Sequence, residues 1–588
     1  MVRGPDFMAT KARILPVHPS TLRALWLSSM RSAKPRVDAA GPVRSESQSL
    51  SMRKMCRLIV VALVCSPSLF AAGPVLHREW AGELLIGDIK HFVRLTIVAD
   101  SDPITGTITY PASDTATIPL SAISVGHGHV RFSWTDDSGP MSFDGGISAG
   151  LLAGTVRTGS KHGTLQLAPT VPMTSEAEQR LLGYYEMRPG HVVSVLKFPL
   201  GPVYSDYTTG RVGVLFSSSE DTFFAGPAFQ VPVPIAIRCH LSTDPVEKLV
   251  ALHWNDESGQ QIGRKLDQRR EEVTFKDGDV VLSGTLVLPN RKGPYPAIIR
   301  IQGAGPQTRR NAFDGWFAYH GVAYLSFDKR GTGKSTGDWR EAGISELADD
   351  VLAAVRSLRE RNDIDPDQIG IEGDSEGGWI APVVATRDPR IKFIVIWAGP
   401  AMDYVAELMN EVEENVRASG LSGDELKKAL EFKRKAIQMI ADGAGLSDDA
   451  WAEFQAFVGP YRNEKWFPYV SEPKERGWAQ KKLYLMARIK SSELWRQVKI
   501  PVLALYGDKD LNVPAAKNAA ALTQELTAAG NRDFIIKVFS DANHDGFETT
   551  NPMLNGEQMR YLKRIVPGLV DTQITWVLAH VRIRASGS

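Results

Sequence analysis

Apolar and polar residues alternate in short runs over the first part of the chain, with turn-forming Gly, Asp, Ser and Pro between the runs. Residues 92–98 are one example within a region that extends from 74 to 170. A second region, 171–270, begins with a helical pattern near 175–182, which is interpreted as a linker, and continues with further alternating runs. Alternation with a period of two predicts antiparallel strands. We therefore expect two β-rich regions, which show no catalytic motif and serve structural or substrate-orienting roles.

The pattern changes at residue 271, from where apolar runs alternate with helical segments as far as residue 588. Residues 272–275 and 280–288 predict a hairpin that turns at 276–278. Near-continuous apolar strands between helices indicate an α/β fold, with a mostly parallel sheet that helices cover on both faces. The strands after the hairpin are expected at 297–301, 322–327, 368–372, 393–397, 502–506 and 534–539.

One insertion, at about 401–497, interrupts this rhythm because it has helical patterns and no clear strands. Its predicted helices include 421–441, 451–458 and 478–489, and it is rich in Trp, Phe and Tyr. A helical, aromatic insertion before the next strand is typical of a lid over an active site. The alternative is a packed subdomain whose rings fill a core of their own.

The segment 1–73 is interpreted as an N-terminal extension, residues 1–51, followed by a leader sequence from Met52. Basic residues follow Met52, an apolar run covers 58–64, and small residues follow as far as Gly73. This order predicts a secretory signal peptide, with export to the periplasm or beyond and no stable membrane span after its removal. Because residues 1–51 lack hydrophobic periodicity, we expect Met52 to be the true start. The alternative is a genuine tail followed by a membrane anchor.

Composition narrows the possible partners. Sixty-eight Lys and Arg balance 67 Asp and Glu, which gives no electrostatic case for binding nucleic acid. Removal of the leader would also remove Cys56 and Cys65, which leaves Cys239 without a partner for a disulfide. The chain has no Cys/His cluster with zinc spacing, so we expect neither a metal nor another cofactor.

The strongest chemical motif is Gly-Asp-Ser-Glu-Gly at 373–377, which lies between an apolar strand and a helix-compatible run. A G-x-S-x-G sequence in that context predicts a nucleophile elbow, where a sharp turn exposes the serine and the next helix directs its N-terminus at the site. Ser375 is therefore the candidate nucleophile.

A serine hydroxyl needs a base to take its proton and an acid to orient that base. In this kind of fold the acid and then the histidine follow the serine along the chain. The loop after the strand at 502–506 offers Asp508 and Asp510, and the loop after the last strand offers His544. We expect His544 to be the base and one of the two aspartates to orient it.

The oxyanion of an acyl-transfer reaction needs backbone N–H donors. One should be the amide of Glu376, and the other that of Ala304, in a loop where Gly303 and Gly305 let the backbone approach closely. The glycine-rich turn at 328–335 lacks the spacing of a phosphate-binding loop and is interpreted as a structural support for the active-site face.

These motifs together resemble the α/β-hydrolase superfamily, and within it bacterial exported esterases related to dienelactone hydrolases and serine aminopeptidase-like hydrolases. The residues that carry the resemblance are 303–306, 328–335, 373–378, 507–510 and 543–545. The resemblance covers roughly residues 271–585. It implies Asp510 as the acid, because family members with Gly-x-x-Asp before Val-Pro use that position, and leaves Asp508 as a turn-forming residue.

Two residues depart from the family pattern. Gln302 and Asp374 stand where the family often has histidine. An additional carboxylate directly before the nucleophile would shift the pH profile or disfavour anionic substrates. Neither change removes a residue of the Ser-His-Asp set.

The expected function is hydrolysis of small-molecule carboxylic esters through an acyl-enzyme. The alternatives are a thioesterase and a serine peptidase for short peptides or aminoacyl amides, which would need an acid to anchor the substrate amine. The lid offers Glu407, Glu411, Glu413 and Glu414 for that purpose. A binding module that kept the fold is the non-enzymatic alternative.

Overall fold

The structure is a computed structural model that describes residues 79–583, apart from 100, 112–116, 127, 245–249, 310–311, 444–446, 471–476, 488 and 555. The predicted extension and leader at 1–73 lie outside the described residues. Among the helices of the described ranges, none combines the length and the apolar character needed to cross a bilayer.

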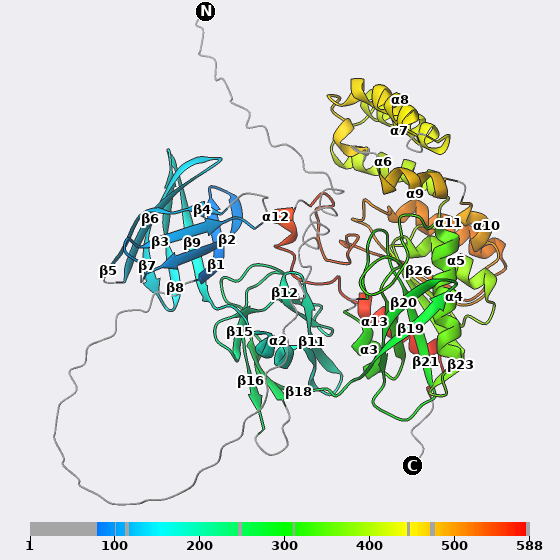
Figure 1. The fold of residues 1–588 in the computed structure, drawn as a ribbon, viewed down its shortest axis with the longest axis horizontal. Coiled ribbons are helices and arrows are strands. Elements are labelled where there is room, and N and C mark those ends of the chain that lie inside the picture. Colours follow the sequence, from blue (N-terminus) through cyan, green and yellow to red (C-terminus); the bar gives the residue numbers. More distant parts are fainter. Residues whose placement is uncertain are drawn as a thin grey trace, which may run out of the picture.

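The first β region forms an antiparallel sheet that, in the described residues, has nine strands in the order β4-β3-β2-β1-β9-β8-β7-β6-β5. The sheet curls around one core, since Ile108 near one end of this order and Val130 near the other end belong to the same buried cluster (Figure 1). The strands are β1 (Glu79–Ile86), β2 (Ile89–Val98), β3 (Thr105–Thr109), β4 (Ile118–Pro119), β5 (Ser121–Gly126), β6 (His129–Asp136), β7 (Gly139–Ser148), β8 (Leu151–Thr158) and β9 (Lys161–Thr170).

The second β region forms another antiparallel sheet, with described strands in the order β13-β12-β11-β10-β18-β17-β16-β15-β14. The helix α2 (Ser175–Leu181) is more than the predicted linker, because Leu181 is fully buried in the core of this sheet. The strands are β10 (Gly183–Arg188), β11 (His191–Phe198), β12 (Gly201–Asp206), β13 (Val212–Val214), β14 (Phe216–Ser217), β15 (Thr222–Ala225), β16 (Ile237–Thr243), β17 (Val250–Asp256) and β18 (Gly259–Lys265).

The third sheet has the order β19-β20-β22-β21-β23-β24-β25-β26 among the described residues and confirms the predicted α/β class. Its first hairpin is antiparallel, and the strands from β22 onward pair in parallel. The hairpin turns at Gly278 and Asp279, later than predicted, because Gly278 supplies the positive φ that the turn needs. The strands are β19 (Arg269–Asp277), β20 (Val280–Leu288), β21 (Tyr295–Ile301), β22 (Ala323–Phe327), β23 (Ile364–Asp374), β24 (Ile394–Trp397), β25 (Val502–Gly507) and β26 (Phe534–Phe539).

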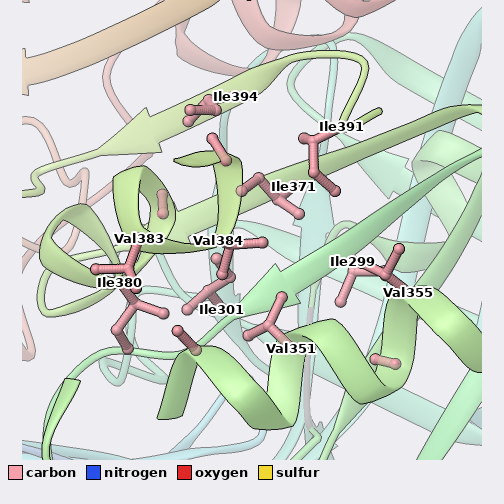
Figure 2. Packing of buried hydrophobic residues seen from close by; sticks show 14 of the residues in the cluster. Ile299, Ile301, Val351, Val355, Ile371, Ile380, Val383, Val384, Ile391 and Ile394 are labelled. Carbon is pink, nitrogen blue, oxygen red and sulfur yellow. The ribbon is translucent and has the colours of Figure 1, made fainter. Parts of the chain in front are cut away.

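Successive residues of these strands point to opposite faces, and each face has its own core. Ile299 and Ile371 pack with Val351 and Val355 of α4 (Figure 2), whereas Ile298 packs on the other face with α3 and α13. Each fully buried aliphatic side chain contributes roughly 1.5–3 kcal/mol to folding. The helices are α3 (Asp314–Tyr319), α4 (Ile344–Arg359), α5 (Gly377–Arg387), α11 (Ala515–Ala528), α12 (Gly556–Met559) and α13 (Leu569–His580).

The insertion between β24 and β25 is helical, as predicted, and α6–α8 project from the rest of the fold (Figure 1). Phe432, Phe454 and Trp466 are buried together in a core of the insertion itself, which agrees with the alternative interpretation of its aromatic residues. The helices are α6 (Tyr404–Ala418), α7 (Asp424–Ala441), α8 (Asp448–Val458), α9 (Trp478–Met486) and α10 (Ser491–Trp495), with short 3-10 turns at Gly459–Tyr461 and Phe467–Tyr469.

The segment 557–566, which follows the His544 loop, joins the two β sheets to the third. The N–H of Phe92 in β2 donates to the carboxylate of Glu557 at 2.7 Å. The N–H of Phe229 donates to the carbonyl of Leu562 at 2.7 Å, and that of Ile565 donates to Gly210 at 2.9 Å. Backbone pairing therefore ties the second β region to this segment, and a hydrogen bond to a side chain ties the first.

Candidate active site

Ser375 lies at a sharp turn between β23 and α5, in a left-handed conformation with φ of 50°. This conformation costs a non-glycine residue energy, and the surrounding chain must hold it. A Cβ on Gly373 would lie 2.8 Å from the carbonyl oxygen of Gly377, and one on Gly377 would lie 2.9 Å from that of Ile301. Both glycines are thus needed for strand and helix to approach, as a nucleophile elbow requires.

The loops after β25 and β26 bring the predicted acid and base together. Oδ2 of Asp510 lies 2.8 Å from Nδ1 of His544. Oδ1 of Asp510 accepts hydrogen bonds from the N–H groups of Asn512 and Val513 at 2.8 and 2.9 Å, which fixes the carboxylate. The Asp510 side chain is fully buried, whereas that of His544 is 18% exposed. The acid is therefore shielded and the imidazole stays accessible.

Asp508 has a separate structural role, as the sequence predicted. Its carboxylate accepts a hydrogen bond from the N–H of Asp541 at 2.7 Å and pairs with Lys509 at 3.0 Å. These contacts join the loop after β25 to the turn after β26, which supports the loop that carries His544.

Trp397, at the end of β24, connects the serine turn to the histidine loop. Its carbonyl accepts the N–H of Ser375 at 3.0 Å, and its indole N–H donates to the carbonyl of His544 at 2.9 Å. One residue thus holds the backbone on which the candidate nucleophile and base are mounted. The sequence contains no signal for this role, because an aromatic residue at a strand end looks like any other core residue.

The predicted oxyanion loop lies against the nucleophile. A Cβ on Gly303 would be 3.3 Å from Cβ of Ser375 and 3.9 Å from its Oγ. The side-chain amide of Gln302, at the position where histidine is often found, donates to the carbonyl of Phe327 and anchors the start of the loop. Ala304 follows Gly303 in this loop, and Glu376 follows Ser375 at the start of α5. Both predicted donors therefore belong to segments that adjoin Ser375.

The carboxylate of Asp374, the second departure from the family pattern, is paired with the guanidinium of Arg300. Arg300 donates to its Oδ2 through Nε at 2.8 Å and a terminal nitrogen at 2.6 Å. Burial, and then the nearby Asp374, raises the pKa of Glu372 above its ordinary range. Glu372 accepts a hydrogen bond from the hydroxyl of Tyr324 beneath the serine turn.

Two of the lid acids, Glu407 and Glu413, are engaged within the protein. Glu413 accepts hydrogen bonds from Lys517 at 2.7 Å and Arg417 at 2.8 Å. Glu407 is buried and accepts one from Asn518 of α11 at 2.8 Å. Burial, together with the negative charges of Glu411 and Asp510, raises the pKa of Glu407 to about 8. Neither residue is arranged to anchor a substrate amine.

Metal-ligating side chains do not gather in the part of the chain that the structure describes. Within those residues, no group of three or more His, Cys, Asp and Glu could hold a metal ion.

Comparison with known proteins places the same region among hydrolases. Residues 277–544 match the X-Pro dipeptidyl-peptidase (S15) family. Esterase EstD of Thermotoga maritima is 24% identical over 320 residues, which are 51% of this chain and 66% of that protein. The quorum-quenching protein AidA of Acinetobacter baumannii is 32% identical over 127 residues, 21% of this chain and 42% of that protein. This chain thus spans less than two thirds of the length of these relatives.

A solved structure of an esterase from Pyrococcus furiosus also aligns with the chain. It has 18% sequence identity and a TM-score of 0.31, and the alignment covers 47% of this chain and 84% of that one.

Proposed function

We propose that this member of the α/β-hydrolase superfamily is a serine hydrolase that cleaves carboxylic esters, with Ser375 as nucleophile, His544 as base and Asp510 as the acid that orients the base. The observation that carries the proposal is the 2.8 Å bond from Asp510 to Nδ1 of His544. That bond makes Nε2 the ring nitrogen for proton transfer. The strained backbone of Ser375 adds support, since it exposes the hydroxyl.

The reaction would proceed in two halves. Oγ of Ser375 attacks the ester carbonyl while its proton passes to Nε2 of His544, and the N–H groups of Ala304 and Glu376 receive the oxyanion. The carbon–oxygen bond to the leaving group then breaks, and His544 returns the proton to the departing alcohol. Water attacks the acyl-enzyme by the same route, which releases the acid and restores Ser375.

A panel of p-nitrophenyl esters of increasing acyl length tests this proposal on the wild type and on Ser375→Ala. We expect turnover by the wild type alone, and labelling by a fluorophosphonate at the peptide that contains Ser375. Ser138→Ala, at an exposed turn of the first sheet, is the control that should keep both signals. Equal ester turnover by the wild type and Ser375→Ala would refute the mechanism.

A peptidase is the second candidate, because the matched S15 family is one of X-Pro dipeptidyl-peptidases. Aminoacyl- and dipeptidyl-anilides, with a thioester as a third class, belong in the same panel. We expect esters to be preferred, since Glu407 and Glu413 are already engaged. Preferential cleavage of an anilide would replace the esterase proposal with the peptidase one, and absence of all turnover would favour a binding module.

We also propose that the protein acts after export, on the strength of the leader pattern at 52–73. Mass spectrometry of the N-terminus of the protein from the native host would show cleavage near Gly73. An uncleaved chain in the cytoplasmic fraction would contradict this proposal.

A further inference from the structure

Lys329, the second residue of the turn that follows β22, is a buried cation beside the candidate oxyanion hole. It is 2% exposed, and its ammonium donates to the carbonyl of Gly303 at 2.8 Å and to the carboxylate of Glu376 at 2.7 Å. Gly303 and Glu376 are 73 positions apart in the sequence, and both adjoin Ser375 in the fold. A single side chain therefore joins the two segments that carry the predicted donors.

The bond to Gly303 has a geometric consequence for Ala304. The carbonyl of Gly303 and the N–H of Ala304 belong to one planar trans peptide, in which the two groups point in opposite directions. By holding the carbonyl, Lys329 directs the N–H of Ala304 away from itself. A Cβ on Gly303 would lie 3.3 Å from Cβ of Ser375, so this peptide borders the nucleophile at which the oxyanion would form.

We propose that Lys329 is a positioning residue, which orients the Gly303–Ala304 peptide and the start of α5 so that the N–H groups of Ala304 and Glu376 converge on the oxyanion. This inference rests on the proposed function, since it names a residue for the same acyl-transfer reaction. Glu376 has two roles in this proposal: its backbone N–H donates to the oxyanion, and its side-chain carboxylate balances the charge of Lys329. Lys329 itself does not contact the substrate.

A purely structural ion pair is the competing explanation, and it predicts different results. A buried pair can be replaced by apolar residues at little cost or with a gain in stability, whereas removal of one partner alone leaves a costly unpaired charge. Replacement of both side chains should therefore restore stability in either case. Only the positioning role predicts that catalysis stays impaired, since the Gly303 carbonyl would still lack its donor.

The variants are Lys329→Met and the double variant Lys329→Met/Glu376→Leu. Methionine suits the site because the packing there leaves a cavity of about 10 Å³, and its flexible stem matches that of lysine. Arg330→Met is the matched control. Arg330 is also a buried cation of this turn, but its guanidinium bonds to Asp350 of α4 and Asp277 of β19 instead of Gly303 and Glu376.

We expect kcat on a p-nitrophenyl ester to fall roughly 100- to 1000-fold in the single and double Lys329 variants, the usual effect of losing one oxyanion donor. KM should change by less than about threefold, since the ground-state ester does not depend strongly on these donors. Inhibition by phenylboronic acid, which forms a tetrahedral adduct with the serine, should weaken in parallel. Arg330→Met should lower the melting temperature and keep kcat within about threefold of the wild type.

The double variant decides between the two explanations. A melting temperature restored to that of the wild type together with a low kcat supports the proposal. Restored stability together with wild-type kcat and boronate affinity overturns it and leaves Lys329 as a structural ion pair. A wild type that neither turns over esters nor is labelled at Ser375 would instead refute the proposed function, so the two failures are distinguishable.

Discussion

Glu407 makes the stability of the protein dependent on pH in a way that one substitution should remove. Its carboxyl group is buried at the base of the lid, where α6 meets Asn518 of α11, and its pKa is raised to about 8 by burial and by its acidic neighbours. In the unfolded chain the same group ionises near its ordinary value of about 4.3. The folded protein therefore holds a proton that the unfolded chain has released throughout the interval between these values.

Because the folded state binds more protons in this interval, its stability falls as the pH rises from about 4.3 to about 8, by ~1.4 kcal/mol per pH unit for this group. The complete loss is on the order of 5 kcal/mol, and it is reached above pH 8. Glu407→Gln cannot ionise and keeps an oxygen that can accept from Asn518. The variant should match the wild type near pH 4 and exceed its stability progressively toward pH 9.

Urea unfolding followed by tryptophan fluorescence from pH 5 to pH 9 measures this difference. Glu453→Gln, an exposed glutamate of α8, is the control and should follow the wild type across the range. If the unfolding midpoints of the wild type and Glu407→Gln differ by the same amount at pH 5 and pH 9, the reasoning from burial is wrong.

Three further substitutions test the site, each with kcat and KM on the best p-nitrophenyl ester as the measurement. Asp510→Asn should lower kcat on the order of 10⁴-fold, since the amide favours the wrong tautomer of His544. A loss below tenfold would show that another residue orients the imidazole. Trp397→Phe removes the hydrogen bond from the indole N–H to the carbonyl of His544, and it should lower kcat about tenfold with little change in the melting temperature. An unchanged kcat would show that other contacts hold the loop. Arg300→Met removes the ion pair with Asp374 and leaves its negative charge uncompensated, so KM should rise more for anionic esters than for neutral ones. Equal effects on both esters would show that the charge of Asp374 does not influence substrate binding.

The central strands of the third sheet could be predicted closely from the sequence, because burial on both faces produces uninterrupted apolar runs. The strand predicted at 502–506 extends over Val502–Gly507 as β25, and every one of its residues is buried. The strand that leads to Ser375 was predicted at 368–372 and extends over Ile364–Asp374. Its outer part contains Pro366 between two aspartates, which local propensity assigns to a turn, and the register with β21 shifts there, between the pairs Tyr295–Ile364 and Ala297–Ile369.

The helix α6 could not be defined by periodicity, since the residues it buries include Glu407, Asn410 and Asn415. A buried polar stripe gives no apolar signal, and its meaning depends on partners such as Asn518 that are distant in the sequence. In the candidate site, too, some residues have a local sequence signal and others depend on distant contacts. The motif residues Ser375 and His544 could be predicted from local context, whereas the role of Trp397 depends on a hydrogen bond across 147 positions.

The backbone pairing of the segment 557–566 limits how this protein can be dissected. The change of pattern near residue 270 suggests a border at which a catalytic fragment could be separated from an interchangeable attachment. Yet Phe547, in the loop that carries His544, packs against Phe229 of the second β region with ring centroids 5.4 Å apart. A fragment cut at that border would expose this ring and leave the backbone groups of Leu562 and Ile565 to water. The second β region is thus packed against the loop that carries His544, and a replacement for it would have to supply the same ring and backbone contacts.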